Sequence, residues 1–305
     1  MARRKTNKAH RDCYQEITNR ILAALEKGTV PWQRPWTDAG AQRSFATDKP
    51  YLGINQVYLD CVALESGYSS HYWLTFGRAK KEGGHVKKGE RGRLVVHYEQ
   101  RTVIKEDETD PDSNPQVRKY PSLAYDLVWN VDQCVDVEAP DEVDEETPFE
   151  PIVSAEKVWS GWADPPKVVE NGSRASYRVQ ADLISLPPRT SFNTPIAFYC
   201  TLFHECIHAT GHHSRLARHD PGSHSIFGSC DYSKEELVAE FGAAMLSGSC
   251  GFDEMIVDSS ASYIDHWRQK LSGDKRLVVA AAGQAQKAAD YVLGIERTYE
   301  KAERT

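Results

Sequence analysis

Two histidines and a glutamate stand at the spacing of a helical metal site in His204-Glu205-Cys206-Ile207-His208. Residues four apart share one face of a helix, so the imidazoles of His204 and His208 can both reach one ion. Glu205 projects to the neighbouring side of the same turn, where it can hold and deprotonate a water instead of binding the metal. Hydrolysis requires this division of roles, and the segment therefore predicts a divalent-metal site of the metallopeptidase type.

The competing interpretation of this segment is a helix whose two histidines are hydrogen-bonded in the core. The surroundings favour the metal: apolar residues such as Phe198 and Leu202 precede the motif, and Gly211 follows where a helix would end. A strand expected around residues 176–186 would give a substrate peptide an edge to which it can add by β pairing. Zn²⁺ is the expected ion, with another divalent metal such as Mn²⁺ as the alternative.

A catalytic zinc ion usually has three protein ligands, so a third side chain is needed. In one class of metallopeptidase it is a histidine ten residues after the first, but Ser214 stands there in this chain. Glu236 and Glu240 lie one turn apart in the next expected helix, and this pattern resembles gluzincins. Glu236 is expected to be the third ligand and Glu240 to orient a ligand histidine, with Glu240 as the alternative ligand.

Three further polar residues near the motif have simpler explanations. Glu235 is expected near the start of a helix, where a carboxylate interacts favourably with the helix dipole. Tyr232 and Arg215 could stabilise a developing oxyanion, but exposed loop positions explain these two residues equally well.

Charge is distributed unequally along the chain. The total is −7, yet residues 1–120 have a net charge of +6 and the remainder −13. Basic residues in the first part are interleaved with aromatic ones, the combination used to bind single-stranded nucleic acid, because cations follow phosphates and rings stack on unpaired bases. Core aromatics and solvated lysine-rich turns explain the pattern equally well. The candidate DNA contacts are Trp32, Arg34, Trp36, Trp73, Lys80, Lys81, Lys87, Lys88, Arg91 and Arg93.

The residue pattern predicts an α+β fold with two domains. Helical periodicity predicts a first helix over 14–25, and short apolar segments predict strands near 73–76, 94–98 and 127–131. Further helices are expected near 154–162, 194–212, 234–248, 260–271 and 276–293. Acidic residues and two prolines crowd the stretch between 132 and 150, which predicts a linker. The expected division is a DNA-binding domain over 1–135, an acidic linker over 136–150 and a gluzincin-type metallopeptidase domain over 151–305.

The composition is that of a soluble globular protein, with 40% hydrophobic and 27% charged residues. No apolar run is long enough to span a bilayer, and the basic N-terminus is followed by polar residues where a secretion signal needs apolar ones. The seven cysteines are odd in number and include no C-x-x-C pair, which argues against a disulfide framework or a cysteine zinc finger. A cytoplasmic protein with no membrane partner is expected.

Several segments together resemble the ArdC-type antirestriction proteins of conjugative plasmids. These segments are Tyr14 to Thr18 through Pro31-Trp32, Tyr51 to Asn55, Trp73 to Phe76, Gly84 to Gly92, His204 to His212 and Glu235 to Glu240. The same module resembles the N-terminal part of TraC-type plasmid primases. The resemblance covers nearly the whole chain. It implies a single-stranded-DNA-binding domain, a zincin-like metallopeptidase domain and protection of plasmid DNA from host restriction during conjugation.

Three functions are consistent with this resemblance. The first is a protein that binds incoming single-stranded DNA and acts on a host restriction component or another protein substrate. The second is a non-enzymatic DNA-masking protein with a structural metal site. The third is a DNA-dependent protease for DNA–protein crosslinks, or a plasmid replication factor. The resemblance leaves open whether the peptidase-type site turns over a protein.

Overall fold

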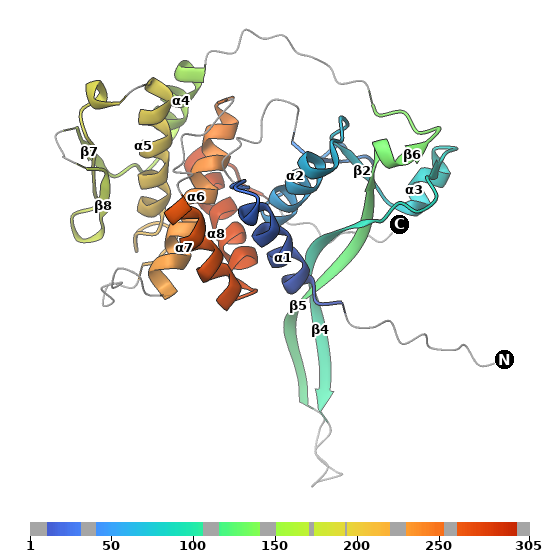
Figure 1. Ribbon diagram of the computed structural model, residues 1–305. Coiled ribbons are helices and arrows are strands. Elements are labelled where there is room, and N and C mark those ends of the chain that lie inside the picture. The colour runs from blue at the N-terminus through green and yellow to red at the C-terminus, as the bar shows by residue number, and fades with distance from the viewer. Residues whose placement is uncertain are drawn as a thin grey trace.

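The computed structural model describes residues 11–31, 41–105, 116–140, 151–170, 174–192, 194–219, 230–252 and 261–297. Helices and strands are mixed, which confirms the expected α+β class (Figure 1). Among the described residues, no helix is both long and apolar enough to cross a membrane.

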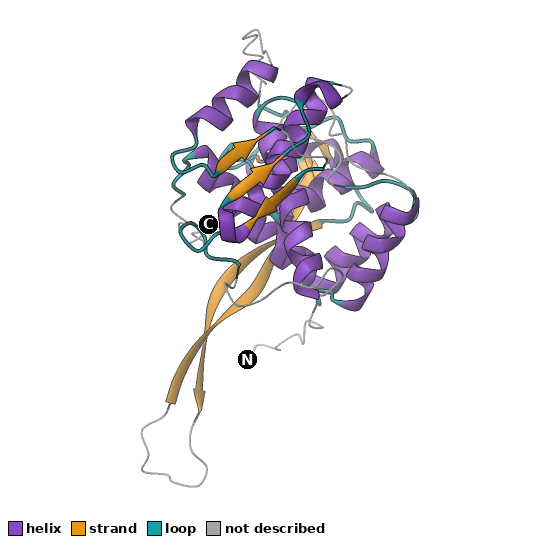
Figure 2. Ribbon diagram, turned by 90° about the vertical axis from the view of Figure 1, so that its left-hand side faces the viewer, coloured by secondary structure: helices purple, strands orange, loops and turns teal. Residues whose placement is uncertain are grey.

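A four-stranded sheet organises the N-terminal part, in the order β1-β2-β5-β4. Its strands are β1 (Arg43–Ser44), β2 (Tyr72–Leu74), β5 (Gln116–Asn130) and β4 (Arg93–Lys105). β4 and β5 pair antiparallel, from Arg93 opposite Val128 to Lys105 opposite Gln116. The outer part of this pair projects from the body as a two-stranded ribbon (Figure 1, Figure 2).

The two faces of this sheet are covered by different helices. Successive side chains of a strand point to opposite faces, so Trp73 enters the main core with residues of α1 (Cys13–Glu26) and α2 (Ile54–Ser66). Tyr72 and Leu74 face a smaller cluster that includes Ala79 of α3 (Phe76–Lys81). Thr75 caps α3, because its hydroxyl accepts a hydrogen bond from the backbone N–H of Arg78 at 3.2 Å.

The acidic stretch expected to be a linker begins as ordered structure. Val131–Gln133 form a 3₁₀ helix, and β6 (Cys134–Val135) pairs with β3 (His85–Val86). The carboxylate of Asp132 accepts hydrogen bonds from the backbone N–H groups of Ser69 and Ser70, at 2.5 and 3.2 Å. The first residues of the acidic stretch therefore belong to the folded N-terminal part. Residues 141–150 lie outside the described residues.

The C-terminal part is a group of helices beside a small sheet (Figure 1). The helices are α4 (Pro151–Gly161), α5 (Pro195–Thr210), α6 (Cys230–Ser249), α7 (Ala261–Gly273) and α8 (Leu277–Leu293). The sheet has the order β7-β9-β8, with β7 (Lys167–Val169), β8 (Ser176–Arg178) and β9 (Leu183–Ser185). All five expected C-terminal helices are thus confirmed, within a few residues at each end.

The single strand expected around 176–186 is wrong, because two antiparallel strands occupy that stretch. A 3₁₀ turn at Val179–Ala181 separates them, and Asp182 then takes a left-handed conformation with φ of 42°. No glycine or proline marks this reversal, so the sequence pattern misses it.

Both parts of the chain contribute to one hydrophobic core, which extends from Cys13 to Val292. The α1 side chain of Thr18 donates to the carbonyl of Lys275, just before α8, at 2.9 Å. Gly53, at the start of α2, donates its backbone N–H to the α8 side chain of Gln286 at 3.1 Å, and its φ of 55° suits glycine. The N-terminal helices therefore pack directly on the helices that support the C-terminal part.

Candidate metal centre

Helix α5 positions the two histidines of the motif. Thr194 caps the helix by accepting a hydrogen bond from the backbone N–H of Ala197 at 3.1 Å, and Pro195 occupies the first helical position. Other residues of the helix are buried in the core, including Phe203 and Ile207. His204 and His208 therefore lie on one face, at the surface that meets α6.

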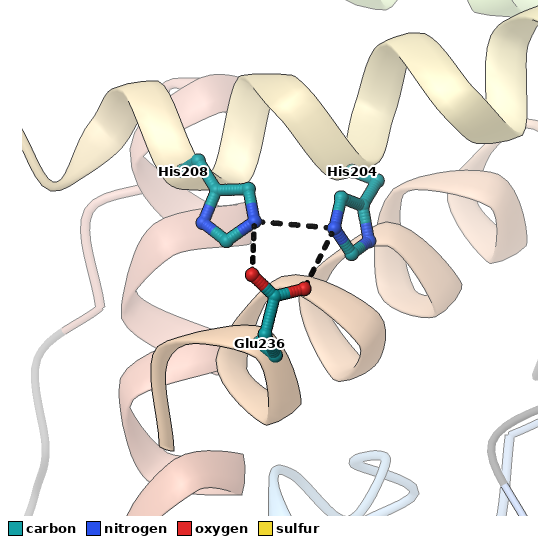
Figure 3. A group of neighbouring side chains, drawn as sticks. All are labelled: His204, His208 and Glu236. Atoms are coloured by element: carbon teal, nitrogen blue, oxygen red, sulfur yellow. Dashed lines mark hydrogen bonds and ion pairs between the residues drawn. The ribbon is translucent and has the colours of Figure 1, made fainter. Parts of the chain in front are cut away.

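The third side chain of the centre comes from α6. The Nε2 atoms of His204 and His208 lie 3.1 Å apart, and they lie 3.5 and 3.6 Å from the two carboxylate oxygens of Glu236 (Figure 3). Ligands about 2.0–2.1 Å from a tetrahedral zinc ion are separated by about 3.3 Å. The three side chains fit a divalent metal both in donor chemistry and in spacing.

A glycine allows the two helices to approach this closely. A Cβ atom at Gly242 of α6 would lie 2.7 Å from the side chain of Ile207 on α5. Such a distance is well inside van der Waals contact, so any larger residue would push the helices apart at this level. The position of Glu236 relative to the histidines thus depends on a small residue six positions further along α6.

The carboxylates around His204 favour a positive charge there. Burial by itself lowers the pKa of His204, but the hydrogen bond to Glu236 and the charges of Glu240 and Glu205 raise it to about 9. Glu205 is 7% exposed. The same carboxylates that stabilise a proton on this imidazole would stabilise a cation bound in its place.

His208 has a carboxylate partner that the sequence pattern did not indicate. Its Nδ1 atom lies 3.5 Å from Glu235, whose carboxylate also accepts two hydrogen bonds from Arg218, at 2.8 and 3.2 Å. Burial opposes ionisation, yet the bonds from His208 and Arg218 lower the pKa of Glu235 to about 2. A carboxylate on the second ring nitrogen fixes the tautomer and the orientation of a metal-binding imidazole.

The loop after α5 holds this arrangement in place. Arg218 also donates to the carbonyl of Ile207 at 2.7 Å, and the Nε2 atom of His219 lies 2.7 Å from the carbonyl of His208. The last carbonyls of the helix thus have side-chain partners. Glu235 was expected to interact only with the helix dipole, and no sequence signal connects it with Arg218, which lies in a loop.

Glu240 lies outside the group of three close ligand atoms. Burial raises its pKa, and it forms a hydrogen bond with Tyr263 of α7 while its charge acts on His204. The geometry therefore favours Glu236 over Glu240 as the third ligand and leaves Glu240 near His204, where the sequence pattern placed it as an orienting residue.

The expectation that Arg215 could stabilise an oxyanion is wrong. Its side chain is 1% exposed and binds both carboxylate oxygens of Asp182, each at 2.8 Å. It also donates to the carbonyl of Asp164 at 2.8 Å. Arg215 instead fastens the β8–β9 connection to the end of α5. The side chain of Tyr232, the other candidate, lies outside those described.

The candidate DNA contacts divide into three groups. Trp32, Arg34 and Trp36 lie outside the described residues. Trp73 is fully buried and its indole N–H donates to Gln42, so it cannot stack on a base, and this expectation is wrong. The exposed members are Lys80, Lys81, Lys87, Lys88 and Arg91.

Arg93, the last of the candidate DNA contacts, is partly buried. It pairs in register with Val128, which is buried in the main core, whereas α3 covers the other face of the sheet. Paired residues point to the same face. Arg93 therefore lies on the face opposite to Lys80 and Lys81.

Comparison with known proteins covers both parts of the chain. A family model described as the N-terminal domain of anti-restriction factor ArdC matches residues 11–129, and one described as a zincin-like metallopeptidase matches residues 163–284. The crystal structure of the antirestriction ArdC protein from the R388 plasmid, in its metal-free form, is 34% identical with a TM-score of 0.70. The match covers 94% of this chain and 100% of that one. The chain belongs to the ArdC antirestriction family.

Similar sequences also occur outside the proteins named ArdC. An uncharacterized protein, y4eC, of Sinorhizobium fredii (strain NBRC 101917 / NGR234) is 31% identical, over 94% of each chain. The DNA primase TraC of Escherichia coli is 31% identical over 93% of this chain, which corresponds to 27% of the primase. The resemblance to ArdC-type proteins and to TraC is thereby confirmed.

A metal is known for one ArdC relative. The R388 plasmid protein also has an Mn(II)-bound crystal structure, which is 35% identical to this chain with a TM-score of 0.69 and covers 93% of it. Together with the zincin-like match, this supports a metal at the centre described above. The finding concerns manganese in the relative and leaves zinc an expectation for this chain.

Proposed function

We propose that this ArdC family member binds single-stranded DNA entering a recipient cell during conjugation and protects it from restriction with the help of a metal-dependent peptidase site. The observation behind the peptidase proposal is the convergence of His204, His208 and Glu236 next to Glu205. Support for DNA binding comes from the net charge of +6 over residues 1–120, the exposed lysines of that part and the match to the ArdC N-terminal domain.

In this proposal His204, His208 and Glu236 hold the ion, zinc by expectation or manganese as in the relative. A bound divalent metal would polarise a scissile carbonyl and lower the pKa of water. Glu205 accepts the proton of the attacking water and passes it to the leaving amine. Glu235 and Glu240 keep the two imidazoles in the orientation that binding needs.

The small C-terminal sheet offers a place for a peptide substrate. β8 is an edge strand of the order β7-β9-β8, and it packs on α5. The backbone groups on the outer side of an edge strand are free to pair with an extended peptide. Arg215 holds the β8–β9 connection through Asp182, so this edge is fixed relative to the metal centre.

Glu205→Gln tests the proposal. It removes the proton acceptor but keeps the size of the side chain, so metal and DNA binding stay at wild-type levels while proteolysis falls by about 10²- to 10⁴-fold. Proteolysis is measured on restriction-enzyme subunits and on a protein crosslinked to single-stranded DNA. Retained cleavage by this variant would remove Glu205 from the mechanism.

A conjugation assay separates the peptidase proposal from its alternatives. If Glu205→Gln protects incoming DNA as well as the wild type does, the protein acts by masking DNA and the site is structural. If cleavage is confined to proteins crosslinked to DNA, the substrate is the crosslink and not the restriction enzyme. Loss of protection together with loss of cleavage supports the proposal.

A further inference from the structure

The N-terminal part presents an exposed aromatic ring at the start of α3. Phe76 is 47% exposed, although phenylalanine is usually buried. The ammonium group of Lys80 lies 5.1 Å from the centre of its ring, at cation–π distance. An apolar ring beside a cation is a feature of surfaces that bind unpaired bases.

A second aromatic ring, that of Trp129, packs against Phe76. Trp129 of β5 meets it edge to face, with ring centres 5.8 Å apart. Trp129 pairs with Leu74, so it lies on the sheet face that α3 covers. This contact restricts the motion of the Phe76 ring on one side, which reduces the conformational entropy lost when a base stacks on it.

The basic loop between β3 and β4 reaches the same tryptophan. A Cβ atom at Gly92 would lie 2.7 Å from the Trp129 ring, so the backbone of this loop rests on the indole. The residue before it is the exposed Arg91. The loop and α3 thus form one surface, which we call the Phe76 surface: Phe76, Lys80, Lys81, Lys88, Arg91 and Trp129.

The cations of the Phe76 surface are available for phosphates. Within the described residues, Lys80, Lys81, Lys88 and Arg91 have no ion-pair partner. Two carboxylates next to these cations in the sequence are engaged elsewhere: Glu82 pairs with Arg78 at 2.6 Å, and Glu90 accepts from Gln133 at 2.7 Å. Unneutralised lysines beside an exposed ring match the alternation of phosphate and base along a single strand.

We propose that the Phe76 surface is a binding site for single-stranded DNA, with one unpaired base stacked on Phe76 and the neighbouring phosphates on Lys80, Lys81, Lys88 and Arg91. The inference rests on the proposed DNA-binding function and gives it a location. It replaces the buried Trp73 with Phe76 as the stacking residue.

Fluorescence anisotropy of a labelled oligothymidylate, measured with the full chain over a series of salt concentrations, tests this site. Phe76→Leu keeps an apolar side chain but removes the ring, and it lowers affinity about tenfold, or about 1.4 kcal/mol. Phe76→Trp keeps affinity at or above the wild-type level. Leu64→Ala, at a residue that is similarly exposed (46%), is the matched control and leaves affinity unchanged.

The salt dependence of the binding constant distinguishes the contribution of base stacking from that of phosphate contacts. Phe76→Leu leaves the slope of log K against log salt unchanged, whereas Lys80→Ala lowers its magnitude by about 0.7, as expected for one phosphate on a single strand. If wild-type protein binds the oligonucleotide and Phe76→Leu binds equally tightly, this site is wrong while the DNA-binding proposal stands. If the wild-type protein fails to bind the oligonucleotide, both the Phe76 site and the DNA-binding proposal are wrong. An equal loss on duplex DNA also overturns the stacking inference, because paired bases are not available to the ring.

Discussion

The metal centre and the Phe76 surface differ in how firmly their side chains are held. At the metal centre each ligand histidine is close to another carboxylate, Glu240 for His204 and Glu235 for His208. On the Phe76 surface only the rings are supported, while the exposed lysines have no ion-pair partner among the described residues. The first region can select an ion by geometry, and the second can hold a polymer of variable sequence by charge and stacking.

This difference implies different sensitivities to substitution. Coordination is short-ranged and directional, so the loss of one group at the metal centre cannot be made up by its neighbours. Phosphate binding is summed over several exposed cations and is screened by salt, so each cation contributes little.

The largest expected effect separates Glu236 from Glu240. Glu236→Ala removes a ligand and weakens Mn²⁺ and Zn²⁺ binding by more than the roughly 100-fold that loss of a supporting residue causes, whereas Glu240→Gln stays within that limit. Isothermal titration calorimetry with each metal measures both variants. The opposite order would make Glu240 the ligand and Glu236 the supporting residue.

A smaller effect is expected from the support of His208. Glu235→Gln keeps the shape of the side chain but loses the charge that Arg218 and His208 share, and metal affinity falls about 10- to 100-fold. Competition with a chromogenic chelator measures it. Glu156→Gln is the matched control, because Glu156 also pairs with an arginine, Arg189, but lies outside the metal centre. Unchanged affinity in Glu235→Gln would mean that His208 needs no partner.

The smallest effect is expected on the basic surface. Lys88→Ala and Arg91→Ala together reduce the magnitude of the salt slope by about 1.4, with a loss of affinity of only a few fold near physiological salt. Lys287→Ala removes an exposed lysine of α8 and serves as the control with an unchanged slope. A loss as large as that of Phe76→Leu would show that these cations are as specific as a metal ligand, and the contrast between the regions would disappear.

Local spacing explains why much of the metal centre could be predicted. His204 and His208 share a face because they are four apart, and Glu236 needs only a second helix on that side. Gly211 marks the end of α5 in the sequence as it does in the structure. These features depend on helix geometry alone.

Tertiary contacts explain what could not be predicted. Glu235 meets Arg218 only because a loop folds back on α5, and no spacing rule describes that contact. Trp73 and Phe76 are three residues apart and both aromatic, yet the first is central in the sheet and the second begins a short helix at the surface. The composition shows that an aromatic residue is present, but its burial depends on whether it lies in a central strand or at the exposed start of a helix.

The shared core has a consequence for how this module can be divided and reused. α1 and α2 cover apolar surface of α7 and α8, so a fragment that begins at residue 151 would expose that surface to water. The N-terminal and C-terminal parts are therefore expected to fold and to be transferred between proteins together. The match of the TraC primase spans 93% of this chain and 27% of the primase, as expected if larger proteins acquire the block whole and not in halves.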